Sequence, residues 1–133
     1  CANVPCQHAI QTALGGYQSI NELIEGDGRL LKQRNIAIKM INAIDGLSCN
    51  PAMGALYLFV KVDNSKFNIK SDEQMILDLL KQEKILLVHG RACNIKEQNY
   101  FRLVFLPHVD ELIPALEKLK SFFETYKQVS ISK

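Results

Sequence analysis

Apolar residues recur with a period of about 3.6 positions in four parts of the chain, the pattern of helices that bury one face. Gly15-Gly16 lies inside the first of these helices and predicts either a kink or another chain segment packed closely at that point. Asp45-Gly46 ends the second, because glycine readily adopts the left-handed conformation of a helix C-cap. The four predicted helices span residues 5–24, 30–44, 72–83 and 109–126.

Two further signals define the ends of the later helices. Ser71 and Gln74 have the spacing of a capping box, in which each side chain bonds the backbone amide of the other residue. Pro114 must lie in the first turn of the last helix or make the start of that helix irregular. Beyond Lys127 we expect a frayed tail.

Four shorter segments have the patterns of strands. Residues 47–49 form a predicted short edge strand, and residues 54–62 alternate between an aliphatic face and a face with Tyr57, Phe59 and Lys61. Residues 85–88 are continuously apolar, as in a central strand that is buried on both faces. The last predicted strand spans residues 99–105.

The order of these elements predicts an α+β fold, a small and mainly antiparallel sheet with helices packed on one face. Gly26-Asp27-Gly28 is the clearest boundary, so we predict residues 1–25 as a helix leading from elsewhere and residues 26–133 as the compact domain. No internal repeat or low-complexity segment is present.

Composition narrows the class of protein. Apolar residues make up 47% and charged residues 23% of 133 residues, which suits one globular domain rather than a disordered chain. The 16 basic and 14 acidic residues nearly balance, which argues against a nucleic-acid-binding surface. No apolar run approaches the roughly 20 residues of a membrane span.

The cysteines and the first residue bear on the origin of the chain. Cys1 stands where an initiator Met is expected, which predicts a longer parent polypeptide. No two cysteines form a Cys-x-x-Cys pair and no histidine lies at ligand spacing, so we expect free thiols, a cytoplasmic protein and no metal site.

Arg102 is the candidate functional residue that the pattern singles out. It lies in the middle of an apolar strand, on the same face as Tyr100 and Val104. A guanidinium on a rigid strand can bind a carboxylate with two hydrogen bonds, as in recognition of an amino or 2-oxo acid. Alternatively, Arg102 is a solvent-facing side chain or pairs with a carboxylate such as Asp63.

The loop after residue 88 is a weaker candidate. His89 has no orienting acid and Cys93 has no activating partner that the spacing requires, so we expect neither to be catalytic. Gly26-Asp27-Gly28-Arg29 is too short for a phosphate-binding loop and follows no strand.

Taken together, the segments of this chain resemble the C-terminal part of fold-type-I pyridoxal-phosphate aminotransferases, in particular the alanine and glutamate-pyruvate branch. The resemblance covers nearly the whole chain. It rests on the order and spacing of Asn3-Val4-Pro5, residues 7–17, Pro51 with residues 54–57, residues 79–86 and Tyr100-Phe101-Arg102-Leu103-Val104.

The resemblance implies that Arg102 binds the substrate α-carboxylate and that Asn94 contributes a polar contact. It implies pyridoxal 5'-phosphate in a parent enzyme that exchanges amino groups between alanine or glutamate and a 2-oxo acid, as a homodimer. The Schiff-base lysine and the other cofactor ligands belong to the family's large domain, and we match no residue here to them. We therefore expect no catalytic residue, no bound cofactor and no activity in these 133 residues alone.

The chain departs from the family pattern at Ile95-Lys96-Glu97-Gln98, where relatives commonly have an aromatic-plus-proline segment. This leaves open whether the amino donor is alanine, aspartate or an aromatic amino acid. The alternative function is a stand-alone α+β module that binds a small carboxylate through Arg102 and regulates a partner.

Overall fold

The computed structural model describes residues 1–129 of the chain. These residues divide into two compact units, one made of residues 1–32 and the other beginning at Gln33. Helix α3 (Arg29–Asn42) begins in the first unit and continues into the second. None of the helices in the described part is long and apolar enough to cross a membrane.

The first unit contains two separate helices instead of the predicted helix over residues 5–24, so that prediction is wrong. Helix α1 (Val4–Gly15) ends at the glycine pair, and α2 (Asn21–Ile24) is a single turn. The Gln18 side chain bonds the carbonyl oxygens of Ala13 and Leu14 at 2.7 and 3.2 Å, which satisfies groups that a continuing helix would use. A Cβ at Gly15 would meet nothing within 4 Å among residues 1–129, so the glycines mark a helix end, and no described segment packs against Gly15.

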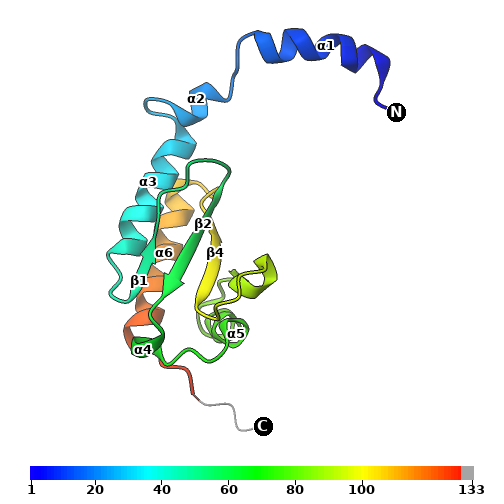
Figure 1. The fold of residues 1–133 in the computed structure, drawn as a ribbon. Helices are drawn as coiled ribbons and strands as arrows, with labels where there is room; N and C mark the ends of the chain where they lie inside the picture. The colour runs from blue at the N-terminus through cyan, green and yellow to red at the C-terminus, as the bar shows by residue number, and fades with distance from the viewer. Residues whose placement is uncertain (130–133) are drawn as a thin grey trace. The chain divides into compact units, whose positions relative to one another are not determined.

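The second unit is built on a four-stranded antiparallel sheet, in which the strands lie in the order β1-β2-β4-β3 (Figure 1). This arrangement confirms the predicted α+β class. The strands are β1 (Leu47–Cys49), β2 (Tyr57–Val62), β3 (Val88–His89) and β4 (Tyr100–Val104).

One face of this sheet carries the hydrophobic core. Leu58, Val60 and Phe101 point into it and are at most 1% exposed. Helix α3, α5 (Asp72–Glu83) and α6 (Val109–Thr125) supply the opposing apolar side chains, among them Ile41, Met75, Leu116 and Phe122. The predicted alternation is confirmed over residues 57–62, where the aliphatic positions of β2 are buried and the others are exposed, whereas residues 54–56 precede the strand.

The prediction of a central strand over residues 85–88 is wrong. Only Val88 and His89 pair with β4, and they do so as the edge of the sheet. Leu86 is 74% exposed, whereas Ile85 and Leu87 are partly buried against the core. A short apolar segment that packs against the core at the edge of the sheet has the same sequence pattern as a strand buried on both faces.

Smaller differences concern the helix ends. The Ser71 Oγ accepts from the Gln74 amide at 3.3 Å as predicted, but the Gln74 side chain donates to Asp78 and does not return to the Ser71 amide. Pro114 lies in the second turn of α6, and the start of that helix is regular. Helix α4 (Asn64–Phe67) and the short 3-10 helix η1 (Gly90–Cys93) were not predicted.

The predicted frayed tail begins with a buried residue. Gln128 is 2% exposed, and its backbone amide donates to the Phe67 carbonyl at 2.9 Å. The chain is therefore fixed one residue beyond Lys127, and residues 130–133 lie outside the described part.

Candidate functional site

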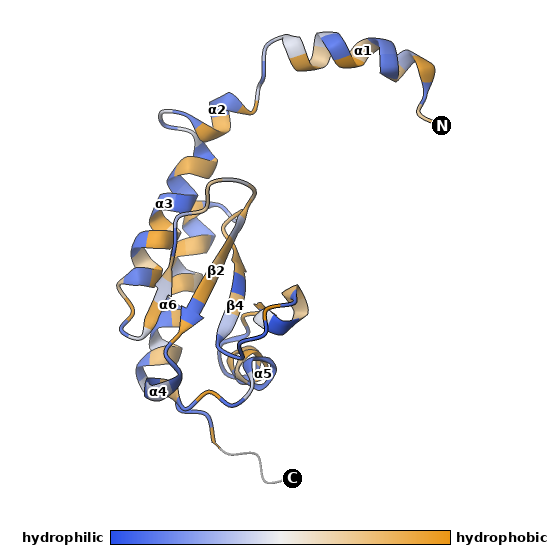
Figure 2. Cartoon of the chain, in the orientation of Figure 1, coloured by the Kyte–Doolittle hydropathy of each residue, from blue (hydrophilic) through white to orange (hydrophobic). Residues whose placement is uncertain are grey.

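The face of the sheet opposite the core carries aromatic and cationic side chains. The antiparallel register places Tyr57 opposite Val104, Phe59 opposite Arg102 and Lys61 opposite Tyr100. Figure 2 shows β2 and β4 as largely hydrophobic strands with a hydrophilic band within β4. We call these six residues the outer face; Tyr57 and Phe59 on it are 42% and 41% exposed.

Arg102 occupies the middle of the outer face. It lies between Phe59 on β2 and Val88 on β3, the residues that pair with it on either side. Its guanidinium carbon lies 4.6 Å from the centroid of the Tyr57 ring, a cation–π contact with the neighbour diagonal to it. The strand thus fixes the base of the side chain, and the tyrosine ring contacts its charged end.

The hydrogen bonds of Arg102 are incomplete. Its Nε is buried and has no hydrogen-bond partner among the residues that the structure describes. The pairing with Asp63 that the sequence left open does not form, because the Asp63 carboxylate caps α4 and accepts from the Ser65 amide at 2.8 Å. Those contacts also lower the pKa of Asp63. A buried donor without an acceptor is unfavourable by about 1–3 kcal/mol, so such a group calls for an explanation in a native structure, and a functional role is one.

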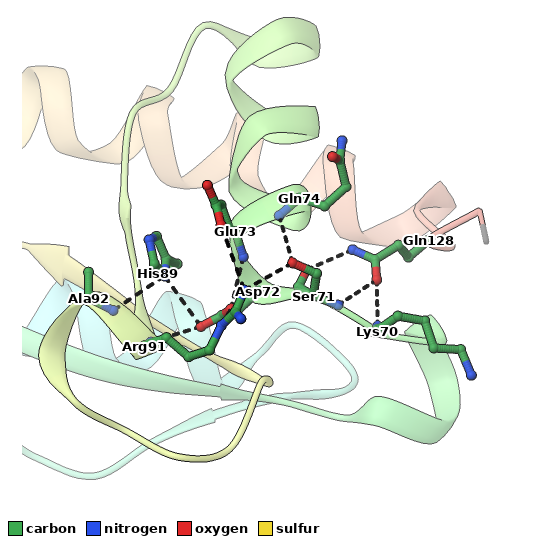
Figure 3. Close-up of polar contacts among 9 residues, drawn as sticks. All are labelled: Lys70, Ser71, Asp72, Glu73, Gln74, His89, Arg91, Ala92 and Gln128. Atoms are coloured by element: carbon green, nitrogen blue, oxygen red, sulfur yellow. Dashed lines mark hydrogen bonds and ion pairs between the residues drawn. The ribbon is translucent and has the colours of Figure 1, made fainter. Parts of the chain in front are cut away.

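A second charged group, at the start of α5, has complete hydrogen bonds (Figure 3). The Asp72 side chain is fully buried and accepts from the Arg91 backbone amide at 2.9 Å and from the Arg91 Nε at 2.7 Å. It also accepts from the Glu73 amide at 2.9 Å. Burial by itself would raise the pKa of Asp72, but the hydrogen bonds and the positive charge of Arg91 outweigh it and lower that pKa below its usual value.

The remaining partners of this group tie three distant segments together. The Arg91 Nη2 donates to the Ser71 Oγ at 3.2 Å, and the Gln128 side-chain amide donates to the Ser71 carbonyl at 2.8 Å while its oxygen accepts from the Ser71 amide at 2.9 Å. Gln128 also accepts from the Lys70 amide. We call Ser71, Asp72, Arg91 and Gln128 the α5 cluster. Its charges are balanced internally, which is typical of a group that holds the fold together.

The α5 cluster fixes the loop that carries the weaker candidates. The His89 Nδ1 accepts from the Ala92 amide at 3.3 Å and so begins η1, and it lies 3.6 Å from the Asp72 carboxylate. Asn94 ends η1 in the left-handed conformation, with φ 61°, and its side chain is exposed. Within residues 1–129, no hydrogen bond or ion pair joins Asn94 to Arg102, and none joins His89 to Cys93.

Two features near Arg102 were not foreseen from the sequence. Tyr57 was placed on the correct face, but its contact with Arg102 depends on the register of β2 and β4, which the sequence does not reveal. A cavity of about 260 Å³ lies beside β4, and Arg102 is among its lining residues together with apolar residues of the 85–88 segment and of α6. In the described part of the chain, no group of three His, Cys, Asp or Glu side chains could hold a metal ion.

Comparison with known proteins identifies relatives for nearly the whole chain. The family model described as aminotransferase class I and II matches residues 1–119. The glutamate-pyruvate aminotransferase AlaA of Haemophilus influenzae is 59% identical over 128 residues, which are 96% of this chain and 32% of that protein. The alanine aminotransferase of Mycobacterium tuberculosis is 48% identical over 96% of this chain and 30% of that protein.

Solved structures agree with these sequence matches. The crystal structure of an aminotransferase from Escherichia coli superposes with a TM-score of 0.88 at 54% identity, over 97% of this chain and 32% of that one. An alanine aminotransferase from Pyrococcus furiosus gives a TM-score of 0.79 at 30% identity, over 93% of this chain and 30% of that one. The chain thus spans about a third of the length of the relatives that it matches.

Proposed function

Because this chain belongs to the class I and II aminotransferase family, we propose that it forms the C-terminal, substrate-gripping part of an enzyme that exchanges amino groups between an amino acid and a 2-oxo acid. The relatives' names favour alanine and glutamate as the amino donors. The observation that carries this proposal is Arg102, a partly exposed arginine in the middle of a strand whose guanidinium makes no hydrogen bond or ion pair with any described residue.

In this proposal Arg102 binds the carboxylate that amino acids and 2-oxo acids share. Its side chain is partly exposed, and of its three guanidinium nitrogens only Nε is both buried and unpartnered. The two Nη atoms therefore form the edge that a carboxylate can reach, with two parallel hydrogen bonds. Binding at this edge orients the substrate, because strand and ring restrict the movement of the guanidinium.

Enzymes of this family use pyridoxal 5'-phosphate, which supplies the electron sink for amino-group transfer when it is bound. The described residues do not fit this group. Asp72 is the only buried carboxylate in residues 1–129, and Arg91 and the Glu73 amide already occupy its oxygens. Lys66, the least exposed lysine of residues 1–129, pairs with Asp45. We therefore assign the cofactor ligands to the two thirds of the relatives' length that this chain does not span.

We further place the enzyme in the cytoplasm as a homodimer. The four cysteines are free thiols, as a reducing compartment favours. None of the residues of helix α1 is buried among residues 1–129, and Ile10 and Leu14 on it are 51% and 76% exposed. Apolar side chains exposed on a helix commonly mark a contact with another chain or domain.

The test is transamination by the protein expressed from the whole reading frame that encodes this chain. With alanine and 2-oxoglutarate, Arg102→Lys lowers kcat/KM about 100-fold, since a lysine cannot form the paired hydrogen bonds. Lys61→Arg on the same face is the matched control and leaves kcat/KM within about twofold. Unchanged kcat/KM in Arg102→Lys would refute the role of Arg102.

The 133-residue chain alone, assayed with added pyridoxal 5'-phosphate, gives no turnover.

Asn94 is the second proposed substrate contact. It is exposed and can donate or accept through its amide, but it makes no bond to Arg102 in the described part of the chain. Asn94→Ala raises the KM for both substrates about threefold if the amide meets the substrate. Exposed Gln98, replaced by Ala, is the control in the same loop.

A further inference from the structure

Tyr57 is the one described aromatic residue whose ring lies against the Arg102 guanidinium. The guanidinium carbon lies 4.6 Å from the ring centroid, within the range of a cation–π contact. Phe59, the cross-strand partner of Arg102, makes no such contact in the described residues, although it is equally exposed. The arginine therefore leans along the sheet toward the residue diagonal to it.

The orientation of the Arg102 side chain toward Tyr57 determines which guanidinium nitrogens can bind a ligand. With the ring on one side and Nε buried, the two Nη atoms are the only nitrogens left for an incoming anion. An arginine on a strand has several rotamers, and fixing its long side chain in one of them costs conformational entropy. A ring that holds the guanidinium beforehand reduces the part of this cost that falls on substrate binding.

We propose that Tyr57 is a positioning residue for the substrate carboxylate: its ring holds the Arg102 guanidinium with the Nη edge outward before substrate arrives. This inference rests on the proposed function and deepens it. Tyr57 does not touch the reacting atoms. It acts equally on the amino acid and the 2-oxo acid, because both present the same carboxylate to Arg102.

The first test uses steady-state kinetics of the protein from the whole reading frame. Tyr57→Leu removes the ring and raises KM about fivefold for both substrates, with kcat within about twofold, because an interaction present throughout the reaction affects binding alone. Tyr57→Phe keeps the ring and restores KM to within about twofold of the parent. Tyr100→Leu is the matched control: its ring lies on the same face under Lys61, and its KM stays within about twofold.

A second test keeps the shape of the side chain. Replacing Tyr57 by phenylalanine and then by 3,4,5-trifluorophenylalanine weakens the attraction of the ring for a cation without removing the ring. KM rises from the first variant to the second if the cation–π contact positions Arg102. Equal KM values in these two variants would overturn the inference even if Tyr57→Leu folds poorly.

The two proposals fail in different ways. If Arg102→Lys has no effect on KM, the proposed carboxylate site is wrong and the Tyr57 inference falls with it. If Arg102→Lys impairs binding while Tyr57→Leu behaves like Tyr100→Leu, the carboxylate site stands and only the role of Tyr57 is refuted.

Discussion

Arg91 and Arg102 have opposite surroundings in the same small domain. Arg91 bonds the buried Asp72 carboxylate and Ser71, and its charge is balanced within the α5 cluster. Arg102 has a tyrosine ring beneath it and a buried Nε without an acceptor. The comparison teaches that incomplete hydrogen bonding, more than the presence of an arginine, distinguishes a site for a ligand from a group that stabilises the fold.

The largest expected effect is a loss of folding stability when the partner of Arg91 is removed. Asp72→Ala lowers the free energy of unfolding by about 3 kcal/mol, because it leaves the Arg91 amide and guanidinium without their acceptor. Urea denaturation of the chain measures the change. Glu73→Ala is the control, since Glu73 is exposed and lies 3.8 Å from Arg91, and it changes stability by no more than about 0.5 kcal/mol. Equal losses in both variants would contradict the assignment.

A somewhat smaller loss tests how far the α5 cluster extends along the chain. Gln128→Ala lowers the free energy of unfolding by about 2 kcal/mol, since the Lys70 and Ser71 amides lose their common acceptor in a buried place. Urea denaturation again reports the effect. Lys127→Ala, at the neighbouring exposed position, is the control, and its free energy of unfolding stays close to that of the parent. If both variants unfold at the same urea concentration as the parent, Gln128 does not belong to the cluster.

Arg102 is expected to behave in the opposite way. Arg102→Met keeps an unbranched side chain over Tyr57 and removes the unpartnered Nε, so the free energy of unfolding stays the same or rises by up to about 1 kcal/mol. Thermal and urea denaturation of the chain measure this change. A loss of more than about 2 kcal/mol would show that Arg102 stabilises the fold, which would place it with Arg91.

The last prediction concerns how stability depends on pH in acid, through the titration of Asp72. The pKa of Asp72 is lower in the folded chain than its ordinary value of 3.8, so the folded state binds this proton less readily than the unfolded state. Its contribution to stability is therefore present above pH 3.8 and is lost as the pH falls toward the folded pKa. Urea midpoints from about pH 2 to 6 fall more steeply in the parent than in Asp72→Asn. Parallel curves would mean that the cluster does not stabilise the carboxylate.

Much of the fold was predictable because its signals are local. The alternation in residues 57–62, the Ser71 cap and the apolar spacing of the last helix each lie within a few residues of sequence. The same locality explains the errors. The apolar spacing continues through Gly15, although the helix ends there. It does not reveal that the Gln18 side chain donates to a carbonyl oxygen at this helix end.

The candidate site was only partly predictable. Arg102 stood out because a charge interrupts an apolar strand, and its face was correct. Its contact with Tyr57 could not be foreseen, because strand register is a long-range property. The Asp72 and Arg91 pair joins residues 19 positions apart and has no signal in either local pattern. Gln128 was hidden for the same reason, in a segment whose sequence resembles a tail.

The register of β2 and β4 gives Arg102 a role while the chain folds. A shift by one residue would turn every side chain of β4 to the other face, moving Phe101 out of the core and the Arg102 guanidinium into it, against Phe123 and the other core residues. A buried charge without a partner is unfavourable by several kcal/mol, which disfavours the shifted alignment. The residue proposed to bind the substrate carboxylate thereby also disfavours the wrong alignment of its own strand, so we expect an apolar replacement to allow misaligned pairing during folding as well as to weaken substrate binding.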